Sequence, residues 1–294
     1  MTNLCLCFNV RQPVYMNRFT VFDIGKNKEH FHDKKNDHQL NDAAKKIYRH
    51  TNSMILRLLE NNIDFKATYI ISGLSLEQFE KYHPDILESF KNLVATGRVE
   101  LLSQPYYSQL SFFYSGKEFK DQVRLYEKKI KEIFSYKPKT FFSELTLSKS
   151  LIKTIEDLGY KIIMAKDNSN NQNFIYKTKN SKSSIILINT GLSDAVNHSF
   201  TEASLTKHPL TVDKYVDKIN KEGRNAHSVN LFIDYSSLGF RHTKSSKILS
   251  LIANLPEAFL ESTANDFKTP SGITQVYPPK TNFKIPRREL SPSG

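Results

Sequence analysis

The chain contains no tryptophan and few of the residues that mark specialised classes of protein. Its 294 residues include 2 Cys, 10 Gly and 11 Pro without a repeating period, which excludes collagen-like and low-complexity sequences. No apolar run approaches the roughly 18 residues of a membrane span, so we expect no membrane partner. Aromatic residues reach 12% of the chain, which excludes disorder throughout. We therefore expect one large domain or two small ones around a sizeable core.

The net charge of +12 arises from 42 Lys and Arg against 30 Asp and Glu. The excess is mostly lysine and is dispersed, with Lys34-Lys35 and Lys128-Lys129 lying beside Asp, Glu or Asn. No zinc-finger or helix-turn-helix spacing is present. The pattern is typical of a solvated surface, and we expect no nucleic-acid partner. The sequence leaves the oligomeric state open.

Cys5 and Cys7 alternate within the apolar run Leu4 to Val10, so a strand would place both thiols on one face. That placement favours buried thiols over a disulfide. Two cysteines in a chain of this length suggest a reducing compartment, and no basic segment precedes the first apolar run. We therefore expect a cytoplasmic protein without a signal peptide.

Short apolar runs that each lead into an amphipathic pattern predict buried strands followed by helices. The alternation implies a parallel sheet with helices outside, and about seven units match a closed barrel better than a small doubly wound sheet. We predict one barrel domain over residues 1–268 and an irregular, proline-rich tail over 269–294. The segment 167–183 is predicted to be a long loop. The predicted strands are 4–10, 65–72, 99–103, 140–144, 161–165, 184–189 and 229–234.

The active sites of parallel barrels lie at the carboxyl ends of their strands, which selects a short set of polar residues. Glu144 and Asp234 end two of the predicted strands and would reach the same mouth. Paired carboxylates suit glycoside hydrolysis, in which one attacks the anomeric carbon and the other protonates the leaving oxygen. Other polar side chains expected at this mouth are Arg11, Gln12, Gln104, Tyr106, Tyr107, Asp194 and Tyr235.

Several blocks, in order along residues 4–275, resemble the α-amylase-like branch of glycoside hydrolase family 57. They are CLCFNVRQP, FKATYIISGLSLEQFEKYHPDILESFKNLVATGRVELLSQPYYSQL, FFSELTLSKSLIKTIEDLGYKIIMAKD, GLSDAVNHSF and VNLFIDYSSLGFRH, the last followed by LPEAFL and FKTPS. The resemblance implies a distorted seven-stranded (β/α)7 barrel of the incomplete TIM-barrel type, related to polysaccharide deacetylase barrels. Those deacetylases use an HxxxH metal set, which this sequence lacks.

The resemblance also assigns roles. Glu144 falls on the family's catalytic nucleophile and Asp234 on its general acid/base, while Asp194 falls on a commonly acidic position and is expected to position substrate. The implied reaction is retaining cleavage or transfer at α-glucosidic bonds of an oligo- or polysaccharide, with no metal and no cofactor. The histidines of HFHDKKNDH, at 30, 32 and 38, tempt a zinc interpretation, but their polar surroundings favour a solvated loop.

The departures from the family pattern matter as much as the matches. Arg11 stands where the family normally has His before Gln-Pro, and Gln104 and Ser108 stand where it often has Glu and His. After Asp234 the usual DYETFGEH becomes DYSSLGFR, so Ser236, Phe240 and Arg241 replace polar or acidic partners. A second hypothesis is therefore an impaired relative that binds glycan without turnover. An ion pair of Arg11 with either carboxylate is expected to count strongly against turnover.

Overall fold

Ten strands form two sheets in the computed structural model, which describes residues 2–26, 30–168, 170–179, 181–198, 210–239, 245–279 and 281–285. The first sheet has the order β3-β2-β1-β8, with β9 pairing with β1, and the second has the order β10-β6-β7-β5-β4. The β6–β7 pair is antiparallel, and the other pairs among these residues are parallel. The strands are β1 Asn3–Val10, β2 Ala67–Ile71, β3 Val99–Leu101, β4 Thr140–Ser143, β5 Ile162–Ala165, β6 Ile175–Lys177, β7 Ser184–Leu187, β8 Val229–Asp234, β9 Asp266–Phe267 and β10 Thr281–Asn282.

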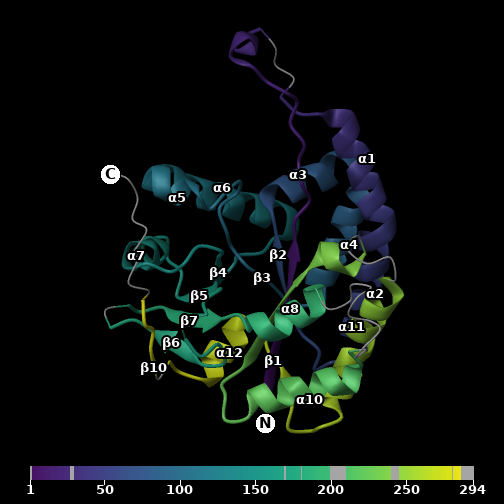
Figure 1. Ribbon diagram of the computed structural model, residues 1–294, viewed down its shortest axis with the longest axis vertical. Helices are drawn as coiled ribbons and strands as arrows, with labels where there is room; N and C mark the ends of the chain where they lie inside the picture. Colours follow the sequence, from purple (N-terminus) through teal and green to yellow (C-terminus); the bar gives the residue numbers. More distant parts are fainter. Residues whose placement is uncertain are drawn as a thin grey trace.

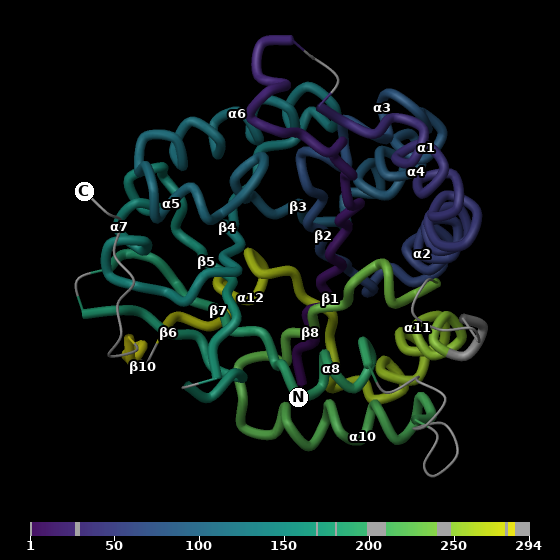
Figure 2. The backbone as a smooth tube through the Cα atoms, turned by 45° about the horizontal axis from the view of Figure 1, so that its top comes forward, coloured from purple at the N-terminus to yellow at the C-terminus, as the bar shows by residue number. Residues whose placement is uncertain are grey.

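Two seams join the sheets into the predicted distorted seven-stranded β/α barrel (Figure 2). At the β3–β4 seam, Ser103 forms a parallel bridge with Phe141, and its N–H donates to the Thr140 carbonyl at 2.9 Å. At the β7–β8 seam, the Asn189 N–H donates to the Asn230 carbonyl at 2.8 Å. The Asn230 side chain donates in turn to the Leu187 carbonyl at 2.8 Å. At the β7–β8 seam, the side-chain amide of Asn230 thus supplies a hydrogen bond in place of regular strand pairing.

Helices surround these strands (Figures 1 and 2). The first long helical segment begins at Asp33 with α1 and passes through a π-helical turn at Ala44–Tyr48 before α2. Ser148 and Gly159 bound α7 as expected, since the Ser148 hydroxyl accepts from the Leu151 N–H and Gly159 has a φ of 95°. The helices are α1 Asp33–Ala43, α2 Arg49–Asn61, α3 Gly73–Tyr82, α4 Pro84–Ala95, α5 Ser111–Tyr114, α6 Gly116–Phe134, α7 Lys149–Asp157, α8 Thr190–His198, α10 Val212–Gly223, α11 Ser245–Leu260 and α12 Pro270–Val276.

The barrel interior is a small apolar core that the last helix helps to fill. Cys5 and Cys7 lie in it with their thiols free, as predicted, and Ile273 of α12 packs into the same cluster. The prediction of an irregular tail is therefore wrong for Pro270–Val276, because an apolar side chain that fills the barrel holds this segment in place. Residues 281–282 also pair with β6, while 286–294 lie outside the described residues. The predicted loop over 167–183 contains β6, which pairs with β7.

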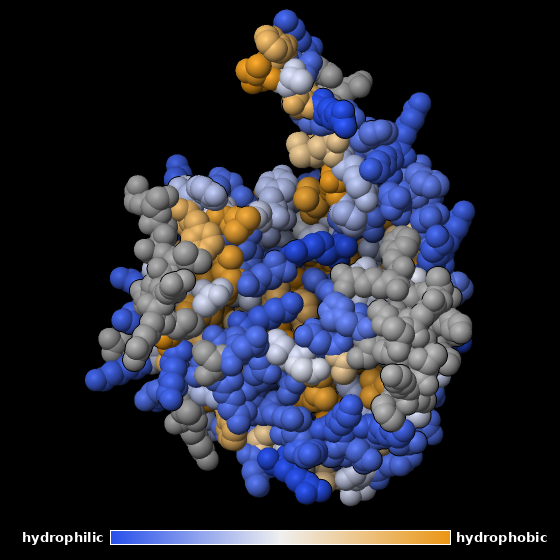
Figure 3. Space-filling model, viewed as in Figure 1, coloured by the Kyte–Doolittle hydropathy of each residue, from blue (hydrophilic) through white to orange (hydrophobic). Residues whose placement is uncertain are grey.

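An arm that includes residues 15–26 and 30–32 projects from the barrel after β1 (Figure 1). It is closed at its base by an antiparallel bridge between Met16 and Phe31. Its tip presents Val21, Phe22 and Ile24, each more than 70% exposed, and apolar atoms are visible there in Figure 3. In the histidine segment 30–38, expected to be a solvated loop, residues 33–38 instead belong to α1, and His32 accepts the Lys35 N–H at its start. Among the described residues, no helix is long and apolar enough to cross a membrane.

We predict that Asn230→Ala lowers the free energy of unfolding by about 1–3 kcal/mol, because it leaves buried partners at the β7–β8 seam without a hydrogen bond. Urea denaturation measures the change. The matched control is Asn254→Ala on α11, whose amide makes only an exposed local contact and whose loss should change stability by less than about 0.5 kcal/mol. Equal effects of the two substitutions would contradict the role of Asn230 at the seam.

We also predict that the native protein does not react with a disulfide reagent at pH 8, whereas the unfolded protein exposes two reactive thiols. Burial raises the pKa of Cys5 from 9.0 to about 12 and that of Cys7 well above its ordinary value, and only the thiolate reacts. Above pH 9 the unfolded thiols ionise and the folded ones do not, so stability should fall as the pH rises. The absorbance of the released reagent measures the labelling. Rapid labelling of the native protein would contradict the burial of Cys5 and Cys7.

Candidate active site

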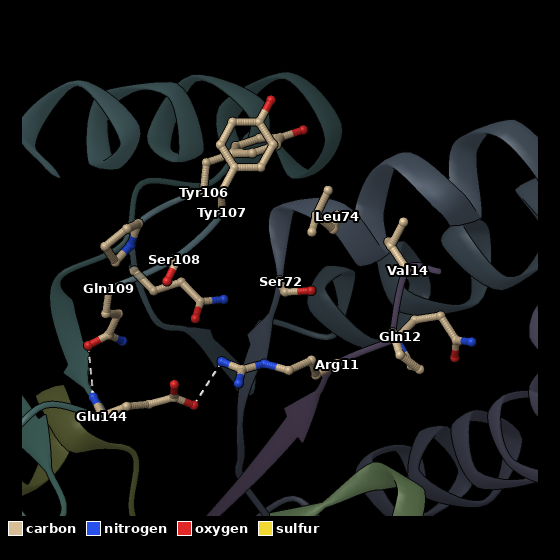
Figure 4. Close-up of a pocket in the computed structure, with 13 residues that line it drawn as sticks. Arg11, Gln12, Val14, Ser72, Leu74, Tyr106, Tyr107, Ser108, Gln109 and Glu144 are labelled. Carbon is tan, nitrogen blue, oxygen red and sulfur yellow. Dashed lines mark hydrogen bonds and ion pairs between the residues drawn. The ribbon is translucent and has the colours of Figure 1, made fainter. Parts of the chain in front are cut away.

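A cavity of about 230 Å³ opens at the carboxyl ends of β1 to β4. The structure brings to it six of the residues expected at the barrel mouth, and Figure 4 shows Arg11 and Glu144 reaching toward each other across it. Loops after four different strands therefore build this site, as the barrel rule predicts. The lining residues are Arg11, Gln12, Pro13, Val14, Ser72, Leu74, Gln104, Pro105, Tyr106, Tyr107, Ser108, Gln109 and Glu144.

Glu144 directly follows β4 and is held at its backbone by Gln109. The Glu144 N–H donates to Gln109 Oε1 at 2.9 Å, and Gln109 Nε2 donates to the Phe142 carbonyl at 3.1 Å. Gln109 is buried, and its side-chain amide bonds the backbone at the end of β4 as a neighbouring strand would. Sequence reasoning missed this residue, since it lies in the irregular stretch after β3, where no periodicity predicts a partner.

Arg11 forms an ion pair with Glu144, with Arg11 Nη2 lying 2.8 Å from Glu144 Oε1. The pair is partly solvated, because the side chains of Arg11 and Glu144 are 50% and 32% exposed. The second carboxylate oxygen of Glu144 points into the cavity (Figure 4). The ion pair expected of an impaired relative is therefore present, and it leaves one oxygen of Glu144 facing the space where a ligand would lie.

Asp234 ends β8 and is held by two asparagines. Asn9 lies directly opposite it in the β1–β8 register and donates from Nδ2 to Asp234 Oδ1 at 2.8 Å. The Asp234 N–H donates to Asn197 Oδ1 on α8 at 3.0 Å. Asp234 does not line the 230 Å³ cavity. The role of Asn197 could not be predicted from its position in the sequence, because its contact with Asp234 depends on how α8 packs against β8.

One strand holds both candidate catalytic carboxylates. Cys5 and Cys7 of β1 point into the barrel, and alternation along an extended chain puts Asn9 and then Arg11 on the same side. Asn9 binds Asp234 of the first sheet, and Arg11 binds Glu144, which follows a strand of the second. Asn9 of β1 and Arg11 directly after it thus link two carboxylates at the strand ends of different sheets.

Tyr106 and Tyr107 form an aromatic wall, with ring centroids 4.8 Å apart in an edge-to-face arrangement. The Tyr106 hydroxyl donates to Glu77 Oε1 at 2.8 Å, and burial together with this carboxylate raises the pKa of Tyr106. The Tyr107 ring is more than half exposed. In a chain without tryptophan, this exposed ring is suited to stack on an apolar sugar face.

Two predicted residues turn their side chains toward the surrounding protein, although Gln12 still lines the cavity. The Gln12 side chain accepts a hydrogen bond from the buried Tyr48 hydroxyl at 3.1 Å and points away from the cavity (Figure 4). Tyr235 is 1% exposed and donates to Asn52 at 2.7 Å in the outer core. Both follow an inward-facing residue by one position, so alternation turns them outward. The burial of Tyr235 contradicts its predicted role as a direct substrate contact, whereas Gln12 lines the cavity and its role stays a prediction.

Of the other positions singled out in the sequence, Ser108 lines the cavity and Asp194 does not. Asp194 lies on α8 with a largely exposed side chain and pairs with His198 at 3.7 Å, away from the cavity lining. Ser108 lines the cavity, and its N–H donates to Gln122 Oε1 at 3.1 Å. Phe240 and Arg241 lie outside the described residues. Within the described residues, no three His, Cys, Asp or Glu side chains are placed to hold a metal ion.

The sequence is similar to a family of known proteins and to a named relative. The model of glycosyl hydrolase family 57 matches residues 5–286. A protein of Methanocaldococcus jannaschii named "Putative alpha-amylase" is 32% identical over 261 residues, covering 85% of this chain and 54% of the relative. This chain thus spans about half the length of that relative.

Two solved structures share the fold at low sequence identity. The 4-alpha-glucanotransferase from Thermococcus litoralis superposes with a TM-score of 0.72 at 16% identity, covering 97% of this chain and 42% of the other. The alpha-amylase AmyC from Thermotoga maritima superposes with a TM-score of 0.67 at 13% identity, covering 100% of this chain and 78% of the other. These likenesses support the barrel architecture.

We predict that Gly73→Ala disturbs the aromatic wall, because a Cβ at this position would lie 2.7 Å from the Tyr106 ring. The ring cannot yield locally, so the substitution should cost about 1–3 kcal/mol of stability and shift the Tyr106 ring resonances. Urea denaturation and NMR measure both effects. Gly116→Ala at the start of α6 is the control, since its Cβ meets nothing within 4 Å and helix propensity favours Ala. Unchanged Tyr106 resonances in Gly73→Ala would contradict the close packing.

Proposed function

Because the chain belongs to glycosyl hydrolase family 57, we propose that it cleaves α-glucosidic bonds of oligo- or polysaccharides with retention of configuration. Glu144 would be the nucleophile and Asp234 the general acid/base. The observation that carries the proposal is that both carboxylates are present at the carboxyl ends of barrel strands, one held by Asn9 of β1 and the other by Arg11 directly after β1. The names of the relatives support an α-glucan as substrate.

In the first step, a Glu144 oxygen attacks the anomeric carbon as the bond to the leaving oxygen breaks, and Asp234 gives its proton to that oxygen. Arg11 occupies Oε1 of Glu144, which leaves Oε2 as the attacking atom. Asn9 donates to Oδ1 of Asp234, so the proton belongs on Oδ2. The two contacts therefore select one reacting oxygen on each carboxylate.

In the second step, Asp234 takes a proton from a water molecule, whose oxygen attacks the anomeric carbon and releases Glu144 as a carboxylate. Arg11 then pairs again with the Glu144 carboxylate. The Gln109 hydrogen bond to the Glu144 backbone keeps the strand end in place through both steps. Two inversions at one carbon give net retention.

The Arg11 ion pair slows the first step only modestly. Ester formation removes the charge of Glu144, so the pair stabilises the free enzyme relative to the intermediate. A partly solvated pair of this kind contributes about 0.2–1 kcal/mol, which corresponds to at most about a fivefold change in rate. Its presence is therefore compatible with turnover.

A second candidate is a glycan-binding relative without turnover, and the Arg11–Glu144 pair is the observation that favours it. A guanidinium here differs from the His that usually precedes Gln-Pro in the family. In this case the cavity and the exposed Tyr107 ring would bind sugar while Glu144 stays neutralised. The two candidates share a ligand and differ in chemistry.

The location of the protein stays a prediction. Two buried, unpaired thiols are typical of a reducing compartment and support our proposal of a cytoplasmic protein.

We predict that the wild type releases reducing ends from maltooligosaccharides and that Glu144→Gln and Asp234→Asn each lower the rate by at least about a hundredfold. Each substitution removes a group that takes part in bond breaking. A reducing-sugar assay measures the rate, and NMR of the first product measures whether the α-configuration is retained. Glu257→Gln, an exposed residue of α11, is the matched control and should leave the rate unchanged.

Calorimetry with the same oligosaccharides separates the two candidates. Binding without cleavage by the wild type would establish the second candidate, and a gain of cleavage in Arg11→His would identify the ion pair as its cause. Neither binding nor cleavage by a folded wild type would reject both. An inverted product would reject Glu144 as nucleophile.

A further inference from the structure

A second cavity, of about 470 Å³, lies at the opposite end of the barrel from Glu144. Lys66, Arg98 and Lys139 directly precede β2, β3 and β4, whereas the catalytic cavity follows the ends of the same parallel strands. The start of α12 forms another side. We call this the basal pocket; the residues that matter here are Lys66, Arg98, Lys139, Lys268, Tyr136 and Gln275.

Positive charge exceeds negative charge in the basal pocket. Its four cations come from four separate segments, and Lys66 and Lys268 share one counter-ion, Asp266, which lies 3.7 Å from Lys66 Nζ. Arg98 and Lys139 form no ion pair within the part of the chain that the structure describes. The pocket therefore keeps cationic groups that the described protein leaves uncompensated.

The one carboxylate in the pocket wall is already fully engaged. Glu100 is buried, accepts from the Thr140 hydroxyl at 2.6 Å through Oε1, and accepts from the N–H and hydroxyl of Ser271 through Oε2. These bonds tie α12 to β3 and β4 and keep the carboxylate turned toward its own partners. With Asp266 included, two carboxylates face four cations.

Arg98 carries the second, independent sign of a ligand. Its Nε is buried and has no hydrogen-bond partner in the structure. A buried donor without a partner costs about 1–3 kcal/mol, and such groups in native proteins usually bind a water molecule or an ion. An acceptor atom placed in the basal pocket would satisfy this donor.

We propose that the basal pocket binds a phosphate group, either as the free ion or as a phosphomonoester. A phosphate dianion matches a net excess of two cationic groups, and its several oxygens suit a guanidinium together with ammonium groups. A volume of about 470 Å³ leaves room for an attached sugar beside Tyr136 and Gln275. This proposal is independent of the chemistry proposed for Glu144 and Asp234.

Isothermal titration with inorganic phosphate and with glucose 6-phosphate, at constant ionic strength with chloride as the reference, tests the proposal. We expect saturable one-site binding to the wild type and a loss of at least about tenfold in affinity for Arg98→Gln and for Lys139→Gln. Lys221→Gln on α10 is the matched control and should bind as the wild type does. Lys139 is exposed, so its variant tests the site even where Arg98→Gln fails to fold.

The two ligands distinguish the source of the phosphate group. Tighter binding of glucose 6-phosphate would show that the sugar also occupies the pocket, and equal binding would restrict the site to the phosphate. No binding of either ligand to the wild type would overturn the proposal. Equal weakening in Lys221→Gln would also overturn it, since it would reveal general attraction to a protein of net charge +12.

Discussion

The geometry of the candidate active site depends on the single strand β1. Its Asn9 holds Asp234 at 2.8 Å, and Arg11, directly after the strand, holds Glu144 at 2.8 Å, although Asp234 lies in one sheet and Glu144 follows a strand of the other. β1 itself is fixed between β2 and β8 by in-register parallel pairing. A shift of one residue in this register would turn Asn9 and Arg11 out of the barrel and release both carboxylates at once.

The seams between the sheets impose a second constraint. Regular pairing stops at β3–β4 and at β7–β8, where a single bridge and buried amide side chains take over. Such amides must be fully satisfied to be tolerated, and Asn189, Asn230 and Asn197 each bond across elements. These polar joints give this barrel its distorted outline, and they tie α8 to the strand that carries Asp234.

Much of this arrangement could be predicted from the sequence, because strand ends mark the mouth of a parallel barrel. The seven strands, the inward thiols and the approach of Arg11 to Glu144 all follow from periodicity 2 and from strand order. Tyr235 was misplaced because proximity to a strand end does not fix the side to which a residue points. Gln109 and Asn197 could not be predicted, since their contacts arise from loop and helix packing.

The strand order also governs when the protein can fold during synthesis. β1 is made first, yet it pairs with β8 and β9, and Asn3 donates to the hydroxyl of Tyr277 at the end of α12. Ile273 completes the barrel interior only from that same helix. Contacts of such long sequence separation form slowly. The nascent chain therefore leaves the ribosome with its first strand lacking most of its partners, and its apolar face needs protection until about residue 277 has emerged.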